Sequence, residues 1–85
     1  MTLTRAHRIH VKQTAKALSM ELEELSRMMP HSPEDRIYAA QTKLIEAYWF
    51  GIMEQRYDEA ERLMLQAMAL IVDGLATVAE RRREQ

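Results

Sequence analysis

The sequence contains no cysteine, only two glycines and two prolines, and few aromatic residues. The absence of cysteine excludes a disulfide scaffold, a cysteine-ligated zinc site and a thiol nucleophile. It also fits a reducing compartment, so we expect a cytoplasmic protein. Because glycine and proline are the residues that most often interrupt helices and strands, their scarcity indicates long, uninterrupted elements.

An excess of charge of one sign is also lacking, since 12 Lys and Arg residues balance 13 Asp and Glu residues for a formal net charge of -1. This balance gives no general support for a nucleic-acid binder, although it leaves room for a local basic patch. The most apolar run extends from Leu63 to Ala79 and is interrupted by Gln66, Asp73 and Gly74. It is short and polar for a bilayer-spanning helix, so we expect a buried helix and no membrane contact.

The first predicted helix covers residues 4–29, because no glycine or proline occurs before Pro30 and Thr4 or Thr2 can cap its start. Its apolar residues are spaced alternately four and three residues apart, which predicts one narrow coiled-coil seam. The members of this seam are Val11, Ala15, Leu18, Leu22, Leu25 and Met29.

The second predicted helix covers residues 33–54. Ser32 is a good N-cap, Pro33 fits the first helical position, and Glu34 and Asp35 place negative charge at the positive end of the helix dipole. One broad face of this helix is apolar, which predicts contact with two neighbours. That face contains Ile37, Tyr38, Leu44, Ile45, Tyr48, Trp49 and Ile52. Phe50 points to the opposite, polar side.

The third predicted helix covers residues 58–83, with Asp58 as a candidate cap. A continuous helix from Pro33 to Arg83 would be about 75 Å long, which is too long for a monomeric bundle of this size. We therefore expect either a turn between Gln55 and Asp58 or an elongated dimer. The stretch 57–70 is also similar to the second helix of a tetratricopeptide repeat, and this resemblance implies a helical hairpin with its turn at the same place.

Apolar residues cover most of the circumference of the third helix, so we expect it to be central. Ala60, Ala67 and Gly74 lie seven residues apart and would let a neighbouring helix approach closely. The predicted fold is therefore all-α, a small three-helix bundle or a helical hairpin with an additional N-terminal helix, in a single domain over residues 1–85. Seven methionines and many aliphatic residues supply more apolar surface than a 10.0 kDa monomer readily hides, which predicts a homodimer.

Residues suited to catalysis are few and scattered. His7 and His10 are three residues apart on a helix but have no third metal ligand nearby in sequence. Both glycines fall within helical patterns, so no phosphate-binding loop is present, and no serine has a convincing general base. We expect no enzymatic activity, no metal and no cofactor.

The function that these features favour is a non-enzymatic helical interaction module, such as a small adaptor, inhibitor or chaperone-like regulator that binds a larger protein. Phe50 is the candidate anchor, with Trp49, Met53 and Tyr57 nearby, because aromatic residues on a polar face are typical binding hot spots. Burial of Phe50 in the interface of a homodimer is an equal alternative.

A small dimeric DNA-binding regulator is the alternative function. Residues 15–28 resemble the helix-turn-helix core of phage-type repressors, with a turn at Ser19, and the resemblance implies a helix-turn-helix segment over 11–29 whose second helix reads the major groove. Arg5, Arg8 and Lys12 are candidate contacts to nucleic acid or another anionic partner, because their positive charge opposes the helix dipole at that end. Three glutamates at the start of the implied recognition helix favour a plain packed helix instead.

Overall fold

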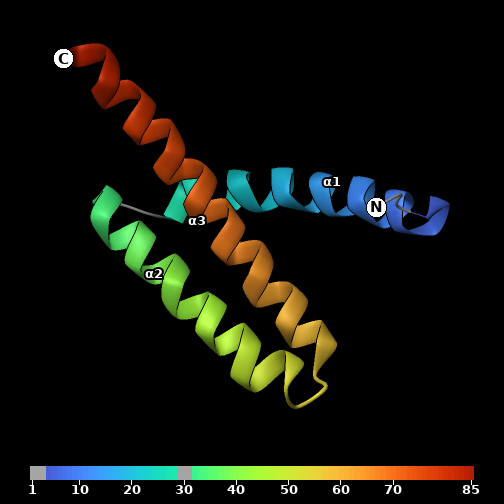
Figure 1. Ribbon diagram of the computed structural model, residues 1–85. Coiled ribbons are helices and arrows are strands. Elements are labelled where there is room, and N and C mark those ends of the chain that lie inside the picture. Colours follow the sequence, from blue (N-terminus) through green and yellow to red (C-terminus); the bar gives the residue numbers. More distant parts are fainter. Residues whose placement is uncertain (1–3, 29–31) are drawn as a thin grey trace.

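The computed structural model describes residues 4–28 and 32–85, and within these residues the chain is all-α, as predicted (Figure 1). Helix α1 covers Arg5–Met28 and α2 covers Pro33–Glu46. The π-helix η1, Ala47–Ile52, continues α2 without a break, and α3 covers Tyr57–Glu84. These bounds lie within about two residues of the ranges that periodicity and capping predict. Met29 and Thr2 lie outside the described residues.

The starts of α1 and α2 have the predicted caps. The Thr4 hydroxyl accepts a hydrogen bond from the backbone N–H of His7 at 3.1 Å, and the Ser32 hydroxyl accepts one from Asp35 at 3.3 Å. The predicted cap of α3 is wrong. Arg56 is the N-cap and makes no side-chain capping bond, whereas Asp58 lies inside the first turn. The chain reverses direction over only three residues, so the helix begins one residue earlier than expected.

The α2–η1 rod and α3 form an antiparallel hairpin, and α1 crosses α3 and then extends away from it (Figure 1). Helix α3 contacts each of the other elements, so its predicted central position is confirmed. Every residue from 4 to 16 is exposed. The arrangement is therefore a helical hairpin with an additional N-terminal helix, and α1 does not close it into a bundle along its whole length.

Small residues form most of the core between α2–η1 and α3, and they allow the two backbones to approach closely. A Cβ atom added to Gly51 would lie 2.6 Å from the Cβ and 2.8 Å from the Cα of Ala60. The expected close approach is thus observed at Ala60, and Ala67 and Gly74 are buried, but an added Cβ at Gly74 would meet only the Ile37 side chain at 3.4 Å. The buried residues of the hairpin are Ala40, Ala47, Gly51, Ala60, Leu63, Ala67, Ala69, Leu70 and Gly74.

The broad apolar face predicted to bury α2 is instead exposed, and this expectation was wrong. Each of its seven members is more than 40% exposed. The hairpin packs through the adjacent side of the helix because its small residues permit a shorter distance between helix axes, which leaves the large side chains outside. In the seam of α1, Leu18, Leu22 and Leu25 are half-buried, whereas Val11 and Ala15 are exposed.

The single chain is less compact than a typical globular domain of its size. Its radius of gyration is 14.6 Å, against about 12 Å for a compact chain of 85 residues. Its accessible surface is 7115 Å², against about 5,200 Å² for a folded monomer of 10.0 kDa. Much apolar surface is therefore left uncovered by the chain itself.

Within the described residues, α3 is the one helix that is long and apolar enough to cross a membrane, a test that the core helix of a soluble protein also passes. Asp73 interrupts its apolar sequence and forms an ion pair with Arg36 of α2. Both side chains are partly buried, and they join the first turns of α2 to the second half of α3.

Candidate functional site

The end of the hairpin, residues 47–57, carries three consecutive aromatic residues on the π-helix η1. We call this segment the tip. The backbone N–H of Met53 donates to the carbonyl of Tyr48, five residues earlier, at 3.0 Å. The rings of Tyr48 and Trp49 meet edge to face with centroids 5.1 Å apart. Short π-helical turns occur frequently at functional sites, which draws attention to this end of the molecule.

A Schellman motif closes the tip. The N–H of Arg56 donates to the carbonyl of Gly51 at 2.8 Å, and the N–H of Gln55 donates to the carbonyl of Ile52 at 3.1 Å. Gln55 has φ 58°, the left-handed conformation that this motif requires and that glycine usually supplies. These bonds satisfy the last carbonyls of the rod and fix the path of the turn into α3.

The contact between Gly51 and Ala60 fixes the tip from the other side. Both residues are buried, and the helices pack so closely here that a Cβ atom at position 51 would overlap the backbone of α3. The aromatic side chains are therefore presented by a backbone that is constrained at two points. A constrained backbone loses little conformational entropy when a partner binds.

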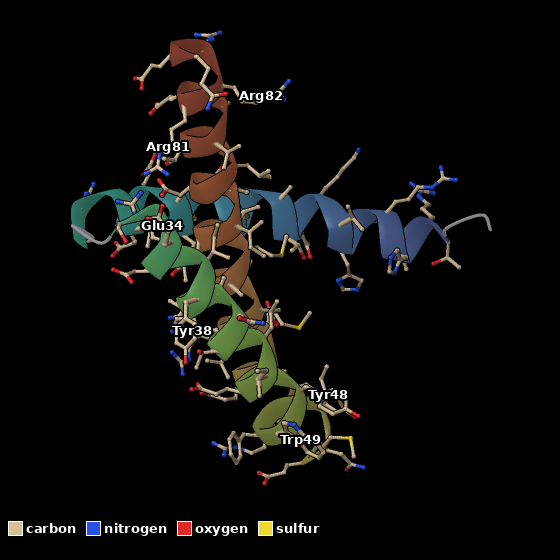
Figure 2. All side chains as sticks on the ribbon, turned by 60° about the vertical axis from the view of Figure 1, so that its left-hand side comes forward. Glu34, Tyr38, Tyr48, Trp49, Arg81 and Arg82 are labelled. Atoms are coloured by element: carbon tan, nitrogen blue, oxygen red, sulfur yellow. The ribbon has the colours of Figure 1, made fainter. Side chains whose placement is uncertain are left out.

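The four residues predicted to bind a partner all lie at the tip with more than half of their surface exposed. Trp49, Phe50 and Met53 are each 56% exposed, and Tyr57 is 64% exposed. Figure 2 shows Trp49 at the end of the rod, projecting away from the ribbon. Sequence reasoning missed Tyr48, which is half exposed and supports the Trp49 ring. Three successive aromatic residues on a helix cannot share one face, so the sequence alone indicated that at least one of them is exposed.

One surface ion pair lies in the first turns of α3, next to the tip. Arg62 donates to a carboxylate oxygen of Glu59 at 2.5 Å, and this hydrogen bond lowers the pKa of Glu59 and raises that of Arg62. An apolar hollow of about 430 Å³ lies between the tip, α3 and α1, lined by Ile52, Tyr57 and Met64 among others. Among the described residues, no three His, Asp or Glu side chains lie together as a metal site. The tip offers surface for an apolar contact.

The basic residues Arg5, Arg8 and Lys12 are all exposed on the part of α1 that extends from the hairpin. Together with Lys16 they are spaced three, four and four residues apart, which places them on one face of the helix. The first turn of α1 contains no acidic residue. This basic arm, residues 4–16, therefore has positive charge along one side without a neighbouring acidic group in sequence.

The continuous first helix predicted from the missing glycine and proline is observed over Arg5–Met28, and the helix-turn-helix that the resemblance to phage-type repressors implies over 11–29 is not formed. Residues 11–28 belong to a single uninterrupted helix, and Ser19 lies in its middle. The physical reason is that the stretch contains no glycine or proline, and its apolar spacing continues through the position of the expected turn.

Comparisons of the chain with known protein families, with curated proteins and with solved structures give no match.

Proposed function

We propose that this protein is a non-enzymatic helical interaction module, of the adaptor, inhibitor or chaperone-like kind, that binds a larger protein through its tip. The observation that carries the proposal is the row of exposed aromatic residues on a constrained π-helical backbone. Aromatic side chains supply large contact areas at low entropic cost, so they dominate protein interfaces. Phe50, Trp49, Met53 and Tyr57 are the proposed contact residues.

We also propose that the module is a cytoplasmic homodimer in which a second copy completes the bundle. The extended shape of the chain and its large accessible surface support this part of the proposal. A stable protein rarely leaves so much apolar surface in water. In such a dimer the tip stays free to bind a partner only if the two copies contact each other through a different surface.

The test compares two aromatic residues of similar exposure at different places. Phe50→Ala removes the proposed anchor, whereas Tyr38→Ala removes a 72% exposed aromatic residue near the other end of the rod, as Figure 2 shows. Each variant, immobilised at equal density, is incubated with lysate of the source cells, and the bound proteins are quantified by mass spectrometry. A specific partner should be lost at least about tenfold with Phe50→Ala and retained with Tyr38→Ala.

Unchanged helicity and melting temperature of both variants are the required control. Equal recovery of every bound protein by the wild type and Phe50→Ala would overturn the role of the tip.

A second candidate function is binding of nucleic acid or another polyanion by the basic arm, as part of a small dimeric regulator. It is favoured by the exposed, one-sided row of positive charge on α1. Replacement of Arg5, Arg8 and Lys12 by Gln should then abolish salt-dependent retention on duplex DNA. The matched control replaces Arg81, Arg82 and Arg83 by Gln, which removes equal charge from the end of α3. Equal effects of both triple variants would show that the retention on DNA comes from nonspecific attraction to positive charge.

A further inference from the structure

Helix α3 carries two apolar seams with the same coiled-coil spacing, and within the described residues only the inner one packs lengthwise against another helix. The inner seam packs on α2–η1 and consists of Ala60, Leu63, Ala67, Leu70 and Gly74. The outer seam consists of Met64, Met68, Ile71, Leu75 and Val78. Alternate spacings of four and three residues characterise helices that pack lengthwise against another helix. The outer seam is thus a ready contact surface about 21 Å long.

The chain leaves the outer seam uncovered. Its members are between 37% and 65% exposed, with Leu75 the most exposed. Helix α1 packs beside the outer seam, where Ala69 is buried and Leu65 half-buried, and its Thr14 lines one hollow with Met64 and Met68. On the α2 side, Ile37 lies against Gly74, and its exposed part extends the same apolar surface.

We propose that a second copy of the chain covers the outer seam, with the two α3 helices antiparallel about a twofold axis near Ile71. This inference rests on the homodimer proposed above and specifies its contact surface and orientation. In that register Met68 faces Leu75 of the other copy, and Met64 faces Val78. The two hairpins would then form a four-helix bundle, with the aromatic tips outside the contact and the arms of α1 beside it.

The chain exposes more surface than a compact monomer of its mass. Its accessible surface exceeds that of a compact monomer by about 1,900 Å². Obligate homodimers bury about 1,000–2,500 Å² on each chain, and their interfaces are the most apolar ones. The exposed first half of α1 contributes part of this excess, and the outer seam with the adjoining exposed residues of α2 contributes apolar surface that a second copy would bury.

The charges of α3 favour the antiparallel orientation. Its first turns contain Asp58, Glu59 and Glu61, and its last turn contains Arg81, Arg82 and Arg83. An antiparallel pair brings the acidic start of one helix to the basic end of the other. A parallel pair would place Arg82 beside Arg82 and Glu61 beside Glu61 of the other copy, which is destabilising.

Arg82 is placed to make this contact. It follows Val78 by four residues and so continues the line of the outer seam. In the antiparallel register it approaches Glu61 of the other copy. Arg81 instead donates a hydrogen bond to Glu34 of its own chain at 3.0 Å. Arg82, which lies on the seam, is therefore the arginine that would contact the other copy.

The first test is the mass in solution of two matched variants by analytical ultracentrifugation. Leu75→Glu places a charge in the outer seam, and Met20→Glu places one on α1 at nearly equal exposure, 65% against 63%. We expect Leu75→Glu to raise the dimer dissociation constant about 100-fold or more, because two buried glutamates would face apolar residues, while Met20→Glu leaves it unchanged. A Leu75→Glu protein that remains as dimeric as the wild type overturns the proposal.

The second measurement leaves the outer seam intact and reports orientation. The chain has no cysteine, so Glu84→Cys introduces one spin-label site per copy. Double electron–electron resonance should give a separation of about 40 Å for the antiparallel pair, because residue 84 lies 13 residues from the axis at 1.5 Å per residue. A separation below about 20 Å would indicate parallel helices and overturn the orientation.

These results separate the two proposals. A wild-type monomer, whether free or bound to phospholipid vesicles, would overturn both the dimer and its surface. A wild-type dimer that resists Leu75→Glu would overturn only the surface. Loss of helicity in Leu75→Glu but not in Met20→Glu supports the surface, because the leucine side chain is mostly exposed in the single chain and its loss there would cost little.

Discussion

A typical monomeric protein buries its large apolar residues and exposes smaller or polar ones. Helix α3 does the opposite, because its buried inner seam is mostly small and its exposed outer seam is large and apolar. The inner seam faces α2–η1 with three small residues in five, whereas the outer seam contains only large apolar side chains. Small residues bring backbones close together but bury little apolar area per residue. The inner seam therefore fixes the distance between the two helices but contributes little hydrophobic stabilisation. The larger hydrophobic contribution remains on the outside, where only another molecule can use it.

The largest expected effect comes from breaking the close packing of the inner seam. Gly51→Ala should destabilise the protein by about 3 kcal/mol, because its Cβ would overlap both the Cβ and the Cα of Ala60. Chemical denaturation at fixed protein concentration measures the free energy of unfolding.

Gly74→Ala is the control at the other end of the same seam. Its Cβ would meet only the Ile37 side chain at 3.4 Å, and alanine is the better helix former, so we expect no loss and a gain of up to about 1 kcal/mol. Similar losses at both glycines would contradict the view that backbone contact is specific to the tip.

The next effect concerns the ion pair beside the inner seam. Asp73→Ala should cost about 2 kcal/mol, because it removes the carboxylate that forms an ion pair with the partly buried Arg36. The double variant Arg36→Met, Asp73→Leu removes both charges and should recover most of that loss. Thermal denaturation of the three proteins at equal concentration distinguishes these outcomes, and a fully additive double variant would show that the pair contributes nothing.

A gain of about 1 kcal/mol is expected from Gln55→Gly. Gln55 has φ 58°, which costs energy for a residue with a Cβ, while glycine adopts this conformation freely and is usual at this position of a Schellman motif. The entropy of glycine in the unfolded chain offsets part of the gain. A higher urea midpoint with an unchanged slope would support the assignment, and a lower midpoint would show that the glutamine side chain contributes to the turn.

Phe50→Ala should change the free energy of unfolding by less than about 0.5 kcal/mol, because the side chain is mostly exposed and the tip backbone is held by Gly51 and Gln55. A circular dichroism melt measures this. A loss above about 2 kcal/mol would mean that Phe50 is buried in the dimer, the alternative that the sequence leaves open.

The smallest effect is the dependence of stability on pH. The backbone N–H of Glu34 and then Arg81 lower the pKa of Glu34, and Arg62 lowers that of Glu59. Because the folded pKa values lie below those of the unfolded chain, both groups stabilise the fold above the unfolded pKa and lose this contribution as the pH falls through the folded pKa. Glu34 is exposed and Glu59 is partly exposed, so the unfolding midpoint should decline only slightly in acid and less at high salt.

Local chemistry made much of the fold predictable. Short-range effects determine where the helices begin and end. Examples are the cap at Ser32, the proline that follows it, and the absence of glycine and proline in α1 and of proline in α3. The small residues at Ala60, Ala67 and Gly74 also indicated where a helix approaches closely. These signals depend on neighbours in sequence or on one helical face, so a single sequence is sufficient to find them.

The buried side of α2 could not be predicted from amphipathicity. The apolar face containing Ile37, Leu44 and Tyr48 is the wider one, yet Ala40 and Ala47 face α3. Periodicity measures how apolar a face is and does not say whether its partner is in the same chain. At the tip, the exposure of Phe50 was predictable, because its neighbours on the same helical face are polar. The π-helix and the left-handed conformation of Gln55 were not predictable, because they depend on how α2 and α3 pack against each other.

The central claim is that the large residues outside the hairpin are covered by a second copy. Sedimentation equilibrium of the wild-type protein at micromolar concentration tests it most directly. Our account predicts twice the 10.0 kDa mass of one chain. A stable, helical species with the mass of a single chain would contradict it.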